Sequence, residues 1–180
     1  MNIIETGFEG LLLIEPKVFP DGRGYFFESY NKQTFRQFGL DTPFVQDNQS
    51  QSQRGVLRGL HFQNPPHAQT KLVRVISGKA LDVCLDIRKG SKTYGQHYTV
   101  ELSAENKKAL WIPEGFAHGF TALTDDMVFC YKCSRNYHRD SEDGILWNDP
   151  QLAIDWKTDQ PLVSEKDKKQ KSFASFQSMF

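Results

Sequence analysis

Charged and titratable side chains interrupt an otherwise apolar stretch, Arg54-Gly55-Val56-Leu57-Arg58-Gly59-Leu60-His61. A polar group that is buried without a partner costs free energy, so each must be paired, exposed or turned toward a ligand cavity. Arg58 and His61 are an odd number of residues apart and would face opposite sides of a regular strand. A bulge or bend at Gly59 would let both side chains share one site. The alternative for His61 is a core histidine satisfied by backbone groups.

Lys71 opens the next strand-like run and has the same parity as Val73 and Val75, which directs its ammonium group toward the interior. Burying an ammonium group in the interior costs free energy unless it pairs with a negative charge. A lysine beside a histidine can stabilise an enolate, because imidazole removes a proton next to a carbonyl while the ammonium holds the oxyanion. The competing interpretation is a lysine that extends to the rim of the fold.

Tyr131 lies in a later strand-like run and shares its parity with Met127 and Phe129. A tyrosine in this position can be an ordinary core residue with a hydrogen-bonded hydroxyl. It can also deliver a proton to the opposite face of a planar intermediate, which inversion of a stereocentre requires. Both interpretations are open from the residue pattern alone.

The segment Pro113-Glu114-Gly115-Phe116-Ala117-His118 resembles the cupin signature P-x-G-x-x-H, in which a tight turn presents the histidine. In metal-binding cupins this histidine is a ligand, together with an H-x-H pair and a glutamate. The first motif here lacks H-x-H, and His67 lies six residues after His61, beside two prolines. We therefore expect no metal, and a metal-dependent cupin oxygenase is the alternative from a different class.

Short alternating or apolar runs separated by Gly, Pro, Asn and Asp predict a mainly β sandwich or barrel that forms one domain over residues 1–180. Residues 71–87 suggest a hairpin around Ser77-Gly78 with one buried face. Further strands are expected at 98–102, 109–112, 119–123 and 127–133. Short helices are expected at 32–38 and 164–171, the second capped by Ser164, and the residues after Lys169 are expected to form an appended tail.

The composition excludes several partners. Lys plus Arg and Asp plus Glu both number 22, so no net positive field attracts nucleic acid or an anionic membrane. No apolar run approaches the length of a membrane span, and no export signal is visible, which favours the cytoplasm. Three cysteines without such a signal are expected to be reduced thiols.

Taken together, R-G-V-L-R-G-L-H, the K-L-V-R-V run, W-I-P-E-G-F-A-H-G-F and Y-K-C followed by Tyr137 resemble the dTDP-4-dehydrorhamnose 3,5-epimerase family. The resemblance extends from about Ile3 to Asp167 and includes V-F-x-D-x-R-G-x-F-x-E-S-Y. It implies a cupin-type double-stranded β-helix, a jelly-roll barrel with a few short helices. It also implies epimerisation of a dTDP-linked 4-keto-6-deoxy sugar through enolates, with no cofactor.

The same resemblance implies roles for individual residues. His61 is the expected base, Tyr131 the proton donor, Lys71 the partner of the C4 oxygen, and Asp167 the carboxylate that orients His61. Arg58, Arg23 and His118 match pyrophosphate contacts, and Tyr137 matches an aromatic residue that stacks on thymine. The other matched substrate-binding positions are Glu28, Gln46, Asp47, Asn48, Glu142 and Lys166.

The resemblance further implies a homodimer whose N-terminal strands reach across, so that Arg23 and Glu28 serve the partner's site. Relatives that invert one carbon share most of these residues, which leaves a 3- or 5-mono-epimerase as the nearest alternative. A non-catalytic module that binds nucleotide sugars is a third hypothesis.

Overall fold

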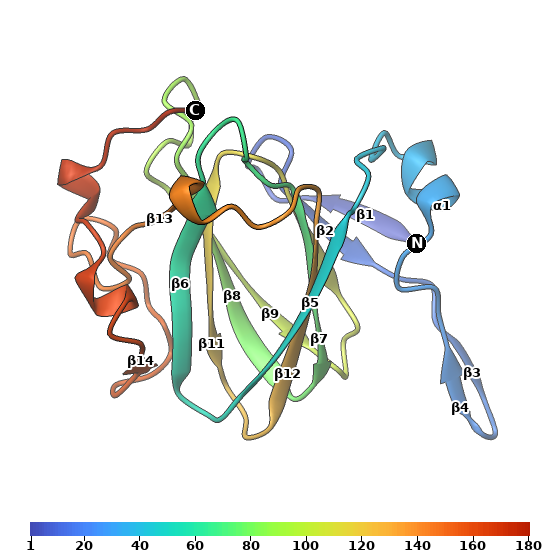
Figure 1. Cartoon of the computed structure of the whole chain (residues 1–180). Coiled ribbons are helices and arrows are strands. Elements are labelled where there is room, and N and C mark those ends of the chain that lie inside the picture. Colours follow the sequence, from blue (N-terminus) through green and yellow to red (C-terminus); the bar gives the residue numbers. More distant parts are fainter.

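The computed structural model describes residues 1–180 and consists of two antiparallel β-sheets that face each other and enclose a barrel (Figure 1). The order of the first sheet is β1 (Asn2–Glu5), β2 (Leu12–Glu15), β10 (Ala109–Ile112), β7 (Lys71–Ser77), β12 (Met127–Cys133) and β5 (Gln46–Ser52). The order of the second is β13 (Glu142–Gly144), β6 (Val56–Gln63), β11 (Phe116–Ala122), β8 (Lys79–Asp86) and β9 (His97–Ser103), with β14 (Leu162–Val163) parallel to β6. This arrangement confirms the predicted jelly-roll class.

A separate hairpin, β3 (Phe19–Asp21) with β4 (Gly24–Phe26), extends away from the barrel (Figure 1). It belongs to neither large sheet. Its aromatic side chains Phe19, Tyr25 and Phe26 are exposed by 49%, 58% and 65%. Large apolar side chains gathered on one projecting element are typical of an interaction surface.

The space between the sheets is filled by apolar side chains from both, including Val73, Leu110 and Phe129 from the first sheet and Phe120 from the second. Phe120 and Phe129 stack across the barrel with ring centroids 4.3 Å apart. The alternation of each strand directs one set of side chains into this core. Phe120 and Phe129 also line a cavity between the two sheets.

The expected hairpin over residues 71–87 is wrong. Strand β7 pairs with β10 and β12, whereas β8 pairs with β11 and β9, so the turn at Gly78 carries the chain from one sheet to the other. Both faces of β8 are buried. Its alternate residues Leu81, Val83 and Leu85 pack outside the barrel against later parts of the chain, while Cys84 packs inside. A covered outer face explains why simple alternation misled the prediction.

One predicted helix is found and the other is shorter than expected. Helix α1 (Lys32–Gln37) begins at Asn31, whose side chain accepts hydrogen bonds from two backbone N–H groups. In place of the helix expected at 164–171 there is a single 3-10 turn, η2 (Asp167–Lys169). The Ser164 hydroxyl accepts a hydrogen bond from the Asp167 N–H at 3.1 Å, as a cap does. Two further 3-10 turns are η1 (Arg139–Ser141) and η3 (Phe173–Ser175).

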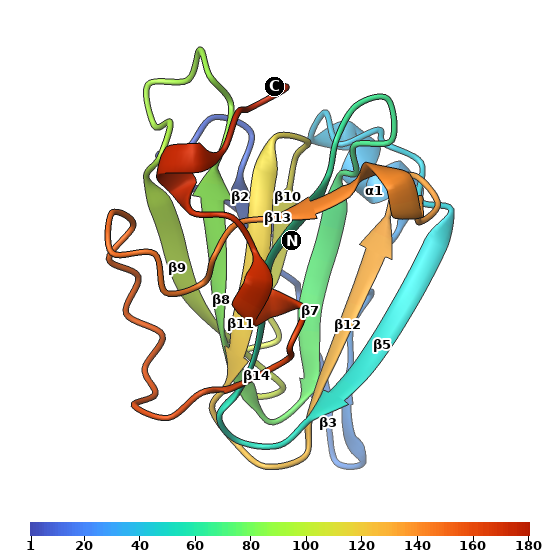
Figure 2. The same cartoon turned by 60° about the vertical axis from the view of Figure 1, so that its left-hand side comes forward.

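The residues after Lys169 are part of the fold and do not form an appended tail. Phe173 and Phe176 are buried against the outer face of the second sheet. Figure 2 shows the C-terminal segment, in red, passing in front of this sheet. The Ser178 hydroxyl donates to the Ile87 carbonyl oxygen. The C-terminal segment therefore covers apolar surface that β8 would otherwise expose to water.

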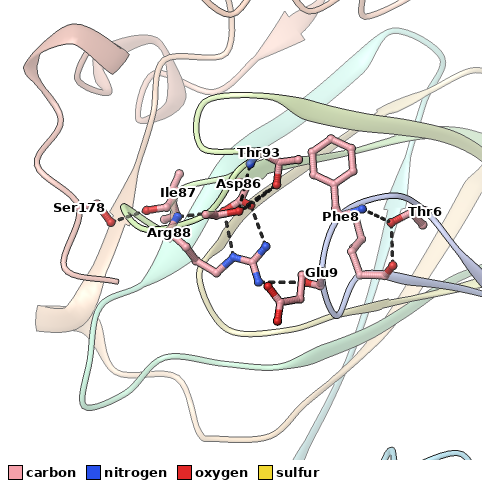
Figure 3. Close-up of polar contacts among 10 residues, drawn as sticks. Thr6, Phe8, Glu9, Asp86, Ile87, Arg88, Thr93 and Ser178 are labelled. Atoms are coloured by element: carbon pink, nitrogen blue, oxygen red, sulfur yellow. Dashed lines mark hydrogen bonds and ion pairs between the residues drawn. The ribbon is translucent and has the colours of Figure 1, made fainter.

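Asp86 is the centre of a buried polar cluster at the end of β8 (Figure 3). It accepts hydrogen bonds from the Arg88 guanidinium at 3.0 and 2.7 Å and from the hydroxyls of Ser91 and Thr93, both at 2.6 Å. Arg88 also donates to the Glu9 carbonyl oxygen at 2.9 Å. Burial opposes ionisation, but these hydrogen bonds outweigh it and lower the pKa of Asp86. The cluster joins the N-terminal loop to the loop after β8.

The three cysteines are free thiols, as the sequence predicts, although Cys130 is only half-buried. None of the helices is both long and apolar enough to cross a bilayer.

Candidate active site

A cavity of about 370 Å³ lies between the two sheets. Side chains from four strands converge on it, with Arg58 and His61 from β6, Lys71 from β7, His118 from β11 and Tyr131 from β12. A smaller hollow of about 110 Å³ adjoins it and shares His61, Lys71 and Tyr131. The hollow is also lined by four residues that the resemblance assigns to substrate binding, Gln46, Asn48, Tyr137 and Glu142.

The bend required in β6 is present. The pairing of β11 with β6 shifts register between His118 and Phe120, opposite Gly59. Gly59 has a φ of +141°, and a Cβ atom there would lie 2.6 Å from the Gly119 Cα atom, so only glycine fits. The irregularity brings Arg58 and His61 to the same cavity, which confirms the prediction.

His61 and Asp167 form an ion-pair-like contact in which the His61 Nε2 atom lies 2.7 Å from Asp167 Oδ1. Asp167 is 3% exposed, and its second oxygen accepts from the Gly59 N–H at 3.3 Å. Burial opposes ionisation of Asp167, but hydrogen bonding to His61, Gly59 and Ser164 outweighs it and lowers the pKa. An ionised carboxylate only accepts, so Nε2 carries the proton and Nδ1 is left as the basic nitrogen.

Burial affects the two remaining predicted catalytic groups in opposite directions. It lowers the pKa of the Lys71 ammonium, while nearby Cys133, Cys84, Asp82 and Glu142 act the other way. It raises the pKa of the Tyr131 hydroxyl, which therefore keeps its proton at neutral pH. The Lys71 amine and a neutral O–H donor thus lie on the cavity beside a histidine, which is a suitable set for proton transfer next to a carbonyl.

A chain of polar contacts runs along the mouth of the smaller hollow. The Tyr137 hydroxyl donates to Glu142 Oε2 at 2.8 Å, and the Lys166 ammonium lies 2.6 Å from the same oxygen. Burial raises the pKa of Glu142, but Lys166, Tyr137 and His61 together lower it below its usual value. Lys166 lines the larger cavity and directly precedes Asp167, so this contact of Glu142 and the partner of His61 belong to one short segment.

Three predicted residues lie away from the cavity within one chain. Arg23, on the β3–β4 hairpin, has a side chain that is 91% exposed and paired with Asp21 at 2.6 Å. Glu28 is exposed and hydrogen-bonds Asn31 at 2.7 Å. Asp47 points away from its neighbours Gln46 and Asn48 on β5 and pairs with Lys132 at 2.6 Å on the outer face. These positions contribute nothing to the cavity of their own chain.

Two residues near the cavity were not predicted from the sequence. Asp82, fully buried on β8, lies 2.9 Å from His118 Nε2 and fixes the orientation of that ring. The signal in the sequence was the alternation of Asp82 with Leu81 and Val83. The prediction gave this strand only one buried face, whereas the structure buries both, so Asp82 was not recognised as an interior residue. Ser50 lines the cavity and has a buried hydroxyl without a partner, which leaves it free for a ligand.

Asp82, Cys84 and His118 have potential metal-ligand atoms within 4.8 Å of one another. This is the part of the barrel where the cupin signature places a metal. The set fits a cation poorly, because Lys71 is close enough for Asp82 and Cys84 to act on its pKa. A metal ion would therefore lie beside the Lys71 amine, which lines the same cavity as His118, and the His118 Nε2 atom is already held by Asp82.

Fold and site together define a class: an acid–base enzyme in a cupin-like jelly-roll barrel, with a histidine–carboxylate pair, a lysine and a tyrosine around one cavity. The model of the dTDP-4-dehydrorhamnose 3,5-epimerase family matches residues 5–175. The chain therefore belongs to this family, whose members are isomerases.

Relatives and solved structures agree with this assignment. The dTDP-4-dehydrorhamnose 3,5-epimerase of Salmonella typhimurium is 54% identical over 169 residues, covering 93% of this chain and 92% of the relative. The crystal structure of that enzyme from Elizabethkingia anophelis has a TM-score of 0.93 at 47% identity, covering 97% of both chains. A Legionella pneumophila 3,5-epimerase in complex with dTDP-4-keto-L-rhamnose also has a TM-score of 0.93, at 48% identity over 98% of this chain and 94% of that one.

Enzymes that act at one carbon are similar to a lesser degree. A dTDP-4-dehydrorhamnose 3-epimerase from Streptomyces niveus is 39% identical over 168 residues, covering 93% of this chain and 81% of the relative. This identity is lower than the 54% of the Salmonella typhimurium 3,5-epimerase and equals the 39% of a 3,5-epimerase from Sulfolobus tokodaii.

Proposed function

We propose that this chain catalyses the 3,5-epimerisation of dTDP-4-dehydro-6-deoxy-D-glucose to dTDP-4-dehydro-L-rhamnose. The observation that carries the proposal is the His61–Asp167 pair, 2.7 Å long, on the same cavity as Lys71 and Tyr131. The family assignment supports the substrate class and argues against both a metal-dependent oxygenase and a non-catalytic binding module.

Each inversion is a two-step exchange of protons. His61 takes the proton from C3 or C5, the electrons of the broken C–H bond form an enolate, and Lys71 stabilises the negative charge on the C4 oxygen. Tyr131 then donates its proton to the other face of the same carbon. The sugar gains and loses one proton at each centre, so its oxidation state is unchanged and no redox cofactor is needed for balance.

The remaining residues serve the nucleotide end of the substrate. Arg58 and His118, which line the cavity, would contact the pyrophosphate, and the exposed Tyr137 ring would stack on thymine. The other binding positions in the same chain are Gln46, Asn48, Glu142 and Lys166.

Incubation with the substrate in deuterated water tests the proposal. We expect label at both C3 and C5 of the product, because one base on one face can reach each acidic hydrogen in turn. Mass spectrometry and NMR of the product locate the label. Label at one carbon alone would reduce the activity to that of a mono-epimerase, and no label would reject enolate chemistry.

The projecting β3–β4 hairpin supports a homodimer in which Arg23 and Glu28 complete the partner's site. The reason is that Arg23, a predicted pyrophosphate contact, has a side chain that is 91% exposed and lies outside the cavity of its own chain.

The cytoplasm is the proposed location, because a charged nucleotide sugar does not cross a bilayer unaided.

Mixing two inactive variants tests this arrangement. Arg23→Ala and His61→Ala should each inactivate every site of their own homodimer. After subunit exchange at equal concentrations, half of the dimers are mixed and each has one intact site, which restores about a quarter of wild-type activity by symmetry. No recovery, despite exchange verified by native mass spectrometry, would place Arg23 in its own chain's site.

A further inference from the structure

We propose that Gln63 is a positioning residue that holds the backbone on both sides of Tyr137 and so presents its ring to the nucleobase. The inference rests on the proposed function, because it concerns the nucleotide end of the same site. Gln63 ends β6 and is 5% exposed. Nothing in its sequence context distinguishes it from an ordinary strand residue.

The Gln63 amide makes three contacts with backbone atoms of two loops. Its Nε2 atom donates to the carbonyl oxygens of His67 at 2.7 Å and Asn136 at 3.4 Å. Its Oε1 atom accepts from the His138 N–H at 2.7 Å. Asn136 and His138 flank Tyr137, so one buried side chain fixes the residue before it and the residue after it.

Other contacts hold the same loop in place. The Tyr137 N–H donates to Gln46 Oε1 at 2.8 Å. The ring of His138 stacks on that of His67, with centroids 3.8 Å apart and planes within 5°. The backbone is thus held at three successive residues, whereas the Tyr137 side chain is 55% exposed and only its hydroxyl is engaged.

A fixed backbone with an exposed aromatic ring suits a planar base. A stacking platform that is already ordered avoids the entropy loss of ordering a loop when the ligand binds. The amide is required because the two loops together offer two carbonyl oxygens and one N–H, and an amide can donate and accept at once. A carboxylate or an apolar side chain cannot satisfy all three.

Calorimetric titration of the Gln63→Met protein with dTDP and with inorganic pyrophosphate separates this role from general damage. Loss of the amide should weaken the binding of dTDP about tenfold. Pyrophosphate, which reaches Arg58 and His118 but not Tyr137, should bind within about twofold of wild type. The KM for the dTDP sugar should rise in parallel with the dTDP dissociation constant, while kcat is unchanged. Gln151→Met alters an exposed glutamine outside the cavity and should leave dTDP binding, pyrophosphate binding, KM and kcat unchanged.

The proposal would be overturned if dTDP and pyrophosphate binding weakened equally, or if only kcat fell. Unchanged dTDP binding would also overturn it. If Gln63→Met does not fold, Gln63→Glu is used, since it keeps an acceptor for His138 and loses both donations. The same selective loss of dTDP affinity is expected. Wild-type protein that binds dTDP but does not epimerise the sugar would reject the proposed reaction and leave the role of Gln63 intact.

Discussion

Replacing His61 with alanine should lower kcat/KM by about 10³-fold or more and abolish deuterium incorporation at both C3 and C5. Both exchanges depend on the same base, because no second histidine on the cavity has a free orientation: His118 Nε2 is held by Asp82 at 2.9 Å. Binding of dTDP should be nearly unaffected, since the proposed contacts with the nucleotide are made by other side chains. Deuterium exchange followed by NMR, together with calorimetry, measures the two effects separately.

The Tyr131→Phe protein is the matched control. It retains His61, Lys71 and the shape of the cavity, so it should still remove protons and incorporate deuterium. Without the hydroxyl, protons return mainly from the face of His61, and the original configuration is regenerated. Exchange without inversion is the expected signature. Full inversion by Tyr131→Phe would exclude this hydroxyl as the donor, and exchange surviving in His61→Ala would exclude His61 as the base.

The Asp86→Ala substitution should destabilise the fold by about 3–5 kcal/mol, because it leaves the Arg88 charge and the hydroxyls of Ser91 and Thr93 without their shared acceptor. For a chain of this size that corresponds to a fall in Tm of about 10 °C. The stability of Asp86→Asn, which keeps one carbonyl acceptor, should lie between those of the wild type and Asp86→Ala. Denaturant and thermal unfolding measure the change. Asp155→Ala, which removes an exposed carboxylate paired with Lys157, should have little effect.

The contribution of Asp86 should also depend on pH in a defined direction. Its pKa is lower in the folded than in the unfolded chain, where a value of about 3.9 is usual. The stabilisation is therefore fully present above that value and is lost as the pH falls through the lower, folded pKa. Wild-type stability should decline in acid more steeply than that of Asp86→Ala. Parallel decline of the two proteins would show that Asp86 is not the group responsible.

Patterns that depend on local geometry were predictable from the sequence. Strands β10 and β12 begin and end where alternation indicated, and the parity of Lys71 with Val73 correctly placed its side chain toward the interior. The bend at Gly59 followed from the odd separation of two polar residues on one strand. In each case the information lies within a few residues of the feature.

Features that depend on distant parts of the chain were not predictable from local patterns. A Gly turn looks the same whether the chain returns within a sheet or crosses to the other one, so the partners of β7 and β8 could not be inferred. The outer face of β8 is buried by Phe173 and Phe176, far along the sequence. Asp82 was missed for this reason, and the approach of Asp167 to His61 was expected only from the family resemblance.

The contact between His61 and Asp167 joins residues 106 positions apart. A ribosome adds about 5–20 residues per second, so His61 is synthesised several seconds before Asp167. Until the C-terminal segment docks, the barrel has an imidazole without its partner and β8 has an uncovered outer face. Catalytic competence therefore requires synthesis past Asp167, and a copy that ends before this residue would be inactive and prone to aggregate.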